Sequence, residues 1–311
     1  MKNQLNPKYE ELFQLIGSHL NDRKGDLAKR ILLISLPLMI IGGTAYVLKE
    51  SGFINTATEF QQTIVMVAFA CFALLSIVYY GVFSFILAIE KRIWIDSTFD
   101  NKKIESKESW RLAWKLTLPV IAIILQVFLR YIIPAIVVCV AVFMLMFYVN
   151  VLMGSKSTFL IYMIQYLVWA AATYAYMYYL IKIKLRFFPF LFIDLYNPAG
   201  YSAGVLFTEL KKLNKISGTE GFKQALLVNV GADSVQALTR LALRSLFNKV
   251  SLMGHAGGFL AAVARPLADE ANRQYVSYAR ITAIYIIYRE ARKELYGEEQ
   301  HINPYIYSLM N

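Results

Sequence analysis

The longest apolar stretch of the chain, from Trp110 to Phe188, contains three segments without an acidic or basic side chain. These segments are 116–129, 131–154 and 157–181, and Arg130 and Lys156 lie between them. An uncharged run of about 18 or more residues is typical of a membrane-spanning helix, because ~30 Å of hydrocarbon requires ~20 residues at 1.5 Å each. The pattern predicts an integral membrane protein.

Basic residues flank this stretch on both sides: Lys91, Arg92, Lys102, Lys103, Lys107, Arg111 and Lys115 before it, and Lys182, Lys184 and Arg186 after it. Short cytoplasmic loops carry an excess of Lys and Arg, so the stretch is expected to start and end in the cytoplasm and to cross an even number of times. Because Pro134 follows Arg130 closely, we interpret 116–154 as one bent element, a crossing followed by a tilted or partly re-entrant piece. A helix rises roughly 21 Å over 116–129, which predicts Arg130 near the outer headgroups. A three-crossing arrangement is the alternative.

Two further apolar runs, 31–48 and 61–89, are each long enough to cross. Basic residues before position 31 keep the N-terminus in the cytoplasm and predict an external loop over 49–62. In the first run, Pro37 and the pair Gly42 and Gly43 are expected to be kink points.

Two segments outside these apolar runs are polar: residues 1–30, which precede the first run, and residues 90–115, which precede the central stretch. Residues 1–30 predict a cytoplasmic amphipathic helix in the membrane interface, or equally a lid packed on the bundle, because apolar residues recur at helical spacing: Tyr9, Leu12, Phe13, Ile16 and Leu20. The segment 90–115 mixes seven basic with five acidic residues. It is expected to be solvated in the cytoplasm, with a helix beginning at Ser106.

Behind the central stretch the chain becomes polar again. Residues 187–193 are too few to span, and Pro189 bends the chain, so this part should turn along the membrane surface. A cytoplasmic helix over 199–215 should break at Ser217 and Gly218.

The last third is ambiguous because Asp233, Gln236, Arg240 and Arg244 fall on one helical face. Such a helix either lies on the surface or crosses imperfectly with this stripe facing a bundle interior. In the run 250–264, Gly254 and Gly258 form a small-residue pair that permits close helix packing. The sequence therefore divides into five parts: an amphipathic segment 1–30, a transmembrane core 31–185, an interfacial segment 186–221, C-terminal helices 222–293 and a polar tail 294–311.

Composition and charge agree with a membrane location. Hydrophobic residues make up 58% of the 311 residues and the mean hydropathy is +0.47, above the level of soluble domains. The net charge of +11 resides mainly at span ends, which indicates contact with anionic lipid headgroups and not with nucleic acid. Cys71 and Cys139 lie in apolar runs, and the three histidines lack metal-ligand spacing, so neither a metal nor a cofactor is expected.

Three short sequences carry a resemblance: ISLPLMIIG at 34–42, RFFPFLFID at 186–194 and IYIIYREAR at 284–292. In order and spacing they resemble the bacterial integral membrane family named after the membrane domain of glycerophosphoryl diester phosphodiesterase. The resemblance implies a multi-pass protein of the cell inner membrane, all-α, with about six membrane-embedded helices plus interfacial amphipathic helices. Asp233, Arg240 and Arg244 depart from it, because the family tends to be apolar there. Phosphodiesterase activity is not implied, since it belongs to a separate soluble domain.

Function is predicted from the placement of polar residues. Charges at span ends favour a non-catalytic membrane scaffold or accessory protein, with membrane lipids and a membrane protein as partners. The alternative is a transporter or lipid-handling protein, which requires ionisable groups inside spans. The positions with that potential are Arg130, Asp194, Asp233, Arg240 and Arg244. An enzyme is not favoured, because Ser202, Asp194 and His255 form no recognised catalytic arrangement.

Overall fold

The computed structural model describes residues 7–99, 104–152, 159–195 and 203–297, and these form helices and no strand, which confirms the all-α fold class. Within the described residues, three helices are long and apolar enough to cross a bilayer: Leu20–Glu50, Glu59–Phe99 and Ser106–Tyr148. The chain is therefore a helical membrane protein. The total of about six membrane-embedded helices stays a prediction.

The chain forms two compact units, each of which combines distant parts of the sequence. Unit 1 contains Met1–Lys115 and Leu227–Ile286, and unit 2 contains Leu116–Leu226 and Ile287–Asn311. The expected transmembrane core, 31–185, is thus shared between the two units. Most of the C-terminal third packs with the first third.

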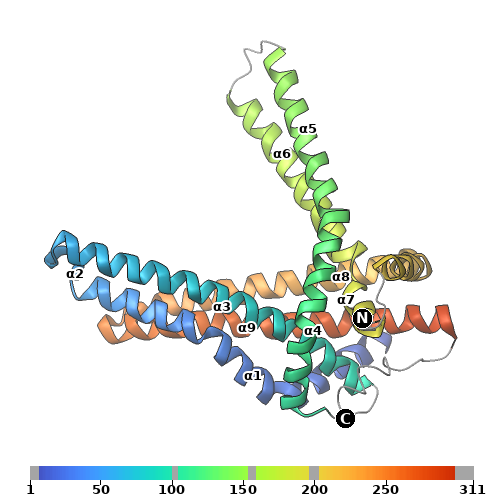
Figure 1. The fold of residues 1–311 in the computed structure, drawn as a ribbon, viewed down its shortest axis with the longest axis horizontal. Helices are drawn as coiled ribbons and strands as arrows, with labels where there is room; N and C mark the ends of the chain where they lie inside the picture. Colours follow the sequence, from blue (N-terminus) through green and yellow to red (C-terminus); the bar gives the residue numbers. More distant parts are fainter. Residues whose placement is uncertain (1–6, 100–103, 153–158, 196–202, 298–311) are drawn as a thin grey trace, which may run out of the picture. The chain divides into compact units, whose positions relative to one another are not determined.

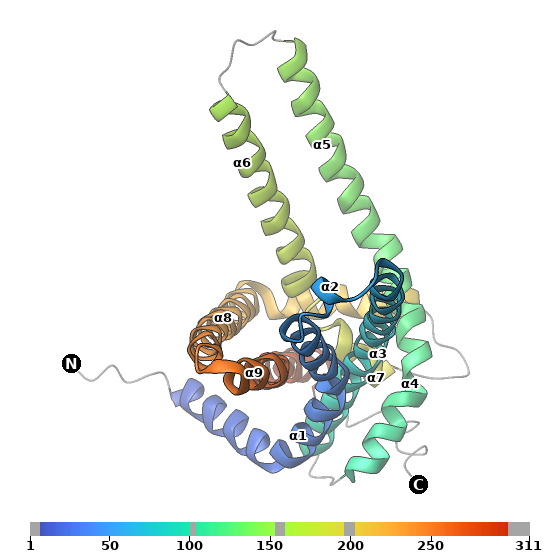
Figure 2. The same cartoon turned by 90° about the vertical axis from the view of Figure 1, so that its left-hand side faces the viewer.

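Unit 1 is built from two helical hairpins that lie side by side (Figure 1, Figure 2). The first consists of α1 (Pro7–Glu50), the short α2 (Phe53–Thr56) and α3 (Glu59–Phe99), and the second of the C-terminal half of α8 (Ala203–Ser251) and α9 (Gly254–Tyr296). Both hairpins turn at the same end, where the Tyr46 hydroxyl donates a 3.0 Å hydrogen bond to the His255 carbonyl oxygen. Helix α1 joins the expected amphipathic segment and the first apolar run without a break; the side chains of Tyr9, Leu12, Phe13 and Ile16 lie outside the described residues.

Glycines allow α1 and α9 to approach closely. A Cβ atom on Gly42 would lie 2.3 Å from the Ala262 carbonyl oxygen, and one on Gly258 would lie 2.4 Å from the Tyr46 hydroxyl. Real Cβ atoms do not come so near. Gly42 requires glycine because its neighbour is backbone, whereas at Gly258 the neighbour is the far end of the Tyr46 side chain. The Gly42 site therefore serves helix packing and not only the expected kink, and α9 lies against the apolar run of α1.

Helix α3 changes its surroundings along its length. Large apolar side chains between Phe60 and Val82 are exposed, whereas those between Ile86 and Ile95 are buried. The exposed zone rises roughly 34 Å, close to the hydrocarbon thickness of a bilayer, while the buried zone is an ordinary protein core. The expectation that 90–115 is a solvated segment is wrong for its first part, because α3 continues to Phe99 and both Glu90 and Lys91 are buried.

Unit 2 contains a helical pair. Helices α4 (Ser106–Val127, whose residues up to Lys115 belong to unit 1), η1 (Phe128–Ile132, a π-helical turn) and α5 (Ile133–Leu152) follow one another without a break. This confirms the start at Ser106 and the continuity of the element through Arg130. The chain returns through α6 (Phe159–Tyr178) and η2 (Tyr179–Lys184) to the short α7 (Phe188–Leu195). Helices α5 and α6 lie side by side (Figure 1, Figure 2), and Trp169 Nε1 donates a 3.3 Å hydrogen bond to the Cys139 carbonyl oxygen.

The predicted position of Arg130 near the outer headgroups and the predicted cytoplasmic position of Lys184 are incompatible with each other. The Arg130 guanidinium lies 4.7 Å from the ring centre of Phe207, Tyr131 contacts the same ring, and Lys184 Nζ lies 5.3 Å from the Tyr131 ring centre. Arg130 and Lys184 thus occupy the same end of the α5–α6 pair. The helical element from 106 to 152 is roughly 70 Å long, too long for one crossing, whereas the 20 residues of α5 match ~30 Å of hydrocarbon. Helix α5 is therefore long enough to cross on its own, and the number of crossings within 116–181 stays a prediction.

Two further expectations concern the segment after α6. The predicted break is confirmed: Gly218 has φ 51° and ψ −151° inside α8. Residues 188–193 form most of α7, and Phe190, Leu191 and Phe192 are buried in the protein; that this segment turns along the membrane surface stays a prediction.

Replacement of Gly42 by Ala should destabilise the protein. The new methyl group must displace the α9 backbone, and overpacking of this kind costs about 1–3 kcal/mol. Gly81→Ala is the matched control, because a Cβ atom at Gly81, also within an apolar helix, meets no atom within 4 Å. The thermal midpoint in detergent should fall for Gly42→Ala and stay or rise for Gly81→Ala. Equal midpoints would refute the close approach of α1 and α9.

Candidate functional site

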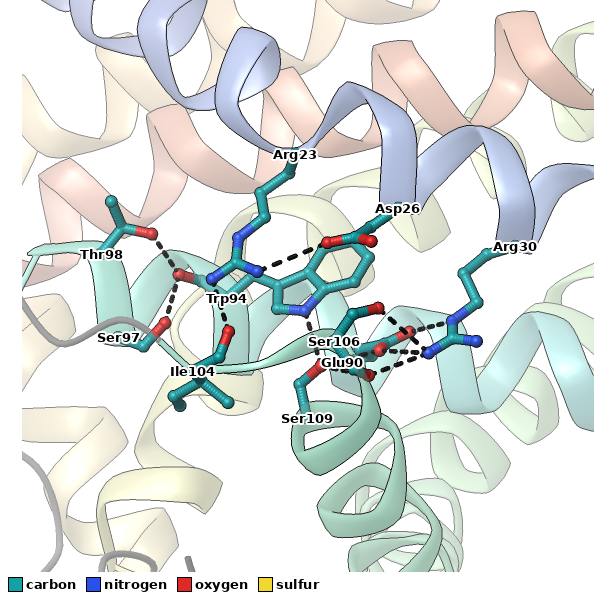
Figure 3. Close-up of polar contacts among 10 residues, drawn as sticks. All are labelled: Arg23, Asp26, Arg30, Glu90, Trp94, Ser97, Thr98, Ile104, Ser106 and Ser109. Atoms are coloured by element: carbon teal, nitrogen blue, oxygen red, sulfur yellow. Dashed lines mark hydrogen bonds and ion pairs between the residues drawn. The ribbon is translucent and has the colours of Figure 1, made fainter.

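A buried ion pair joins α1, α3 and α4 (Figure 3). Arg30 donates two hydrogen bonds of 3.1 Å to the Glu90 carboxylate, which also accepts one of 2.8 Å from the Ser109 hydroxyl. Trp94 Nε1 donates a 2.8 Å hydrogen bond to Ser109, and the Arg30 guanidinium lies 4.1 Å from the ring centre of Trp110. Glu90 and Trp94 are fully buried. Since every polar group named here is satisfied, this network is a structural clamp.

A second polar network joins α3 to α9. The Tyr80 hydroxyl donates a 2.7 Å hydrogen bond to the Glu270 carboxylate, which pairs with Arg273 at 2.8 Å. Further along the interface, Lys91 Nζ donates a 2.7 Å hydrogen bond to Gln274 Oε1. Glu270, Lys91 and Gln274 are all buried, so the interface between these two helices is polar over several turns.

A third group of charges lies between α8 and α9. The Asp269 carboxylate stands between two guanidinium groups, 3.9 Å from Arg240 Nε and 4.0 Å from Arg265 Nε. We refer to these three residues as the charge cluster; its net charge is +1. Arg244 lies one turn from Arg240, nearer the α8–α9 turn, and is exposed.

Helix α8 directs its polar face toward α9 and its apolar face outward. On the inner side Asp233 pairs with Arg280 at 3.0 Å, and the Gln236 carbonyl oxygen accepts a 3.0 Å hydrogen bond from Asn272. On the outer side the exposed side chains include Leu227, Val230, Leu238, Leu241 and Leu246. A surface helix of a water-soluble protein has the opposite arrangement.

A cavity of about 530 Å³ lies at the turn end of unit 1, between α1, α8 and α9. Lys49, Glu50 and His255 line it near the turns, and His255 Nδ1 is 2.8 Å from the Glu50 carboxylate. Arg265 lines its deeper part and links the cavity to the charge cluster. The volume falls within the range of small-molecule sites, about 300–1,000 Å³.

The structure brings together part of the polar set predicted from the sequence. Asp233 and Arg240 both face α9 and pair with residues on it, and Arg244 follows on the same helix. Arg130 and Asp194 belong to unit 2. Asp194 accepts hydrogen bonds from the Tyr288 hydroxyl and the Arg292 guanidinium, which attaches α7 to the end of α9.

Unit 2 also holds a buried cation at the break in α8. Arg186 donates a 2.8 Å hydrogen bond to the Ile183 carbonyl oxygen and another to the Ser217 hydroxyl, next to Gly218. Burial lowers the pKa of Arg186 to about 10, so the side chain stays charged at neutral pH. These two hydrogen bonds stabilise the break, while Arg186 Nε is buried without a hydrogen-bond partner in the described structure.

Sequence reasoning missed Arg265 and Asp269, which complete the charge cluster. A signal was present, because Arg265, Asp269 and Arg273 recur every four residues and so share one helical face. Their partner Arg240 lies far away in the sequence, and the pairing depends on the hairpin turn. Among the described residues no group of three or more His, Cys, Asp and Glu side chains is arranged to hold a metal, and Ser202 lies outside those residues.

Comparisons of the chain with protein-family models, with curated proteins and with solved structures give no match. The resemblance described above therefore stays a prediction, and the function must be argued from the geometry of unit 1.

Replacement of Arg30 by Leu should leave the Glu90 carboxylate buried without its cation and lower stability by about 3–5 kcal/mol. The double variant Arg30→Leu/Glu90→Leu should recover part of this loss, because it removes the unpaired charge. Lys24→Leu is the control, since Lys24 on the same helix is exposed and bonds only to Asn21 in the described structure. Thermal unfolding in detergent measures all three; a double variant no more stable than Arg30→Leu would contradict the clamp.

Proposed function

We propose that the protein is a lipid-handling or transport protein of the membrane, in which unit 1 admits an anionic solute to a polar interior. This choice favours the alternative sequence hypothesis over the scaffold. One observation carries it: the charge cluster lies on a helical hairpin packed against the apolar run of α1, and the outward face of α8 in this hairpin is apolar.

The depth of the charge cluster along the hairpin supports the proposal. Arg240 precedes the end of α8 at Ser251 by 11 residues, and Arg265 follows the start of α9 at Gly254 by 11 residues. Each is thus roughly 16 Å from the turn, about half of the ~30 Å hydrocarbon thickness. The turn itself is level with Tyr46 and Glu50, at the end of the apolar run of α1.

Charges at such a depth are unfavourable and usually functional. An Arg or Asp at the bilayer centre costs about 2.5–3.5 kcal/mol on insertion scales, and such residues typically mark a substrate or ion pathway. A scaffold would gain little from these charges, because the Arg240 and Arg265 side chains are 54% and 42% exposed and contact Asp269 only at 3.9 and 4.0 Å. The cluster therefore favours handling of a solute.

The outward face of α8 supports a position in lipid. Leu227, Leu238 and Leu241 are each more than 60% exposed, and they lie on one side of the helix. In water a continuous apolar stripe of this length would be unfavourable by ~25 cal/mol per Å² of exposed surface. Contact with lipid removes that cost. The polar face of the same helix lies toward α9, where Asp233 and Arg240 have their ion-pair partners.

Two cysteine variants test the proposal in a background that lacks Cys71 and Cys139. Ala262 lines the cavity and Leu241 faces outward, and both lie within roughly 15 Å of the turn. In intact cells an impermeant thiol reagent should label Ala262→Cys and leave Leu241→Cys unlabelled, because the first faces water and the second faces lipid. Labelling of both positions would indicate that α8 is a surface helix in water. Labelling of neither would indicate that the cavity is not open to water. Either result would contradict the proposal.

A further inference from the structure

The cavity at the turn end of unit 1 has a positive balance of charge. Lys49 and Arg265 line it, and Arg240 lies behind it in the charge cluster. The carboxylates nearby are Glu50, which is paired with His255, and Asp269, which stands between two arginines. With three cations against two carboxylates, the site attracts an anion.

The donors of Arg265 are available to such an anion. Within the described residues its one ion pair, to Asp269, is 4.0 Å long, beyond hydrogen-bond distance. A guanidinium group presents N–H donors in a planar fork that matches the oxygens of a phosphate group. Lys49 supplies a second positive charge at the level of the turn.

The walls of the cavity are apolar over a large part. Tyr46 and Phe247 contribute aromatic rings, and Gly258, Ala261 and Ala262 form a wall of small residues. A volume of about 530 Å³ is much larger than a phosphate ion requires. The cavity thus combines a cationic region with apolar walls, which suits an amphiphile that has an anionic headgroup.

We infer that this cavity binds a phosphate group held by Arg265, with Lys49 adding positive charge at the level of the turn and the rest of the ligand against the apolar walls. The phosphate belongs either to a lipid headgroup or to the free ion. This inference rests on the proposed function and adds the chemical class of the solute.

The test uses full-length protein, delipidated in detergent, and isothermal titration calorimetry with three probes. These are a short-chain phosphatidic acid, the corresponding neutral diacylglycerol and inorganic phosphate. Arg265→Gln should raise the Kd for phosphatidic acid by about tenfold or more, equivalent to about 1.4 kcal/mol. Lys49→Gln should raise it by a smaller factor, because Lys49 lies at the level of the turn. The matched controls are Arg244→Gln and Lys249→Gln, because both side chains are exposed near the same end of α8 and neither lines the cavity. They should change the Kd by much less, and thermal unfolding without ligand verifies that every variant is folded.

The probes separate the two sources of phosphate. Binding of phosphatidic acid well above inorganic phosphate assigns a lipid headgroup, whereas equal binding of both assigns the free ion; both outcomes support the site. Three results would overturn the phosphate site. They are diacylglycerol binding as tight as that of phosphatidic acid, no binding of either phosphate probe, and control variants that raise the Kd as much as Arg265→Gln does. If thiol labelling of Ala262→Cys still succeeds in that case, the proposed function stands and only the ligand class is wrong.

Discussion

Hydrocarbon does not solvate charge, and under the proposed function this constraint accounts for the arrangement of α8 and α9. Helix α8 carries Asp233, Arg240 and Arg244 on one face and a row of leucines on the other. The fold resolves this by turning the charged face toward α9, where Asp269 and Arg280 meet it, and by leaving the leucines outside. Gly42 permits the close approach of α1 to the backbone of α9 on the other side of this hairpin.

The polar groups at the buried end of α3 hold neighbouring helices together. Between Phe60 and Val82 the apolar side chains of α3 are themselves the outer surface. In the buried part of α3, Glu90 pairs with Arg30 of α1, Trp94 donates to Ser109 of α4, and Lys91 donates to Gln274 of α9. These satisfied networks fix the angle between helices, whereas the Asp269 contacts of 3.9 and 4.0 Å leave donors unused. Rigid clamps at one end and an incompletely satisfied cluster at the other are what a binding site on a stable support requires.

Much of the fold could be predicted from the sequence, because it depends on local patterns. Uncharged runs locate the apolar helices, Ser106 marks a helix start, and Ser217 and Gly218 mark the break. Contacts between distant segments could not be predicted. The lengths of the uncharged runs predict that 116–154 is one crossing followed by a tilted or re-entrant piece. The contacts of Arg130 with Phe207 and of Lys184 with Tyr131 place both basic residues at the same end of the α5–α6 pair. In the same way, the charges after residue 89 predict a solvated segment. Glu90 is nevertheless buried, because Arg30, which is 60 residues away in the sequence, pairs with its carboxylate.

The central claim, that α8 lies in the bilayer with its charged face inward, can be measured most directly by spin labels placed one at a time along its outward face at Leu227, Val230, Leu238, Leu241 and Leu246. In reconstituted bilayers, collision with oxygen reports lipid and collision with a water-soluble nickel complex reports water. The account predicts that oxygen accessibility rises to a maximum near Leu238 and falls toward both ends, with the nickel complex showing the reverse. High accessibility to nickel at every position would place α8 in water and contradict the account.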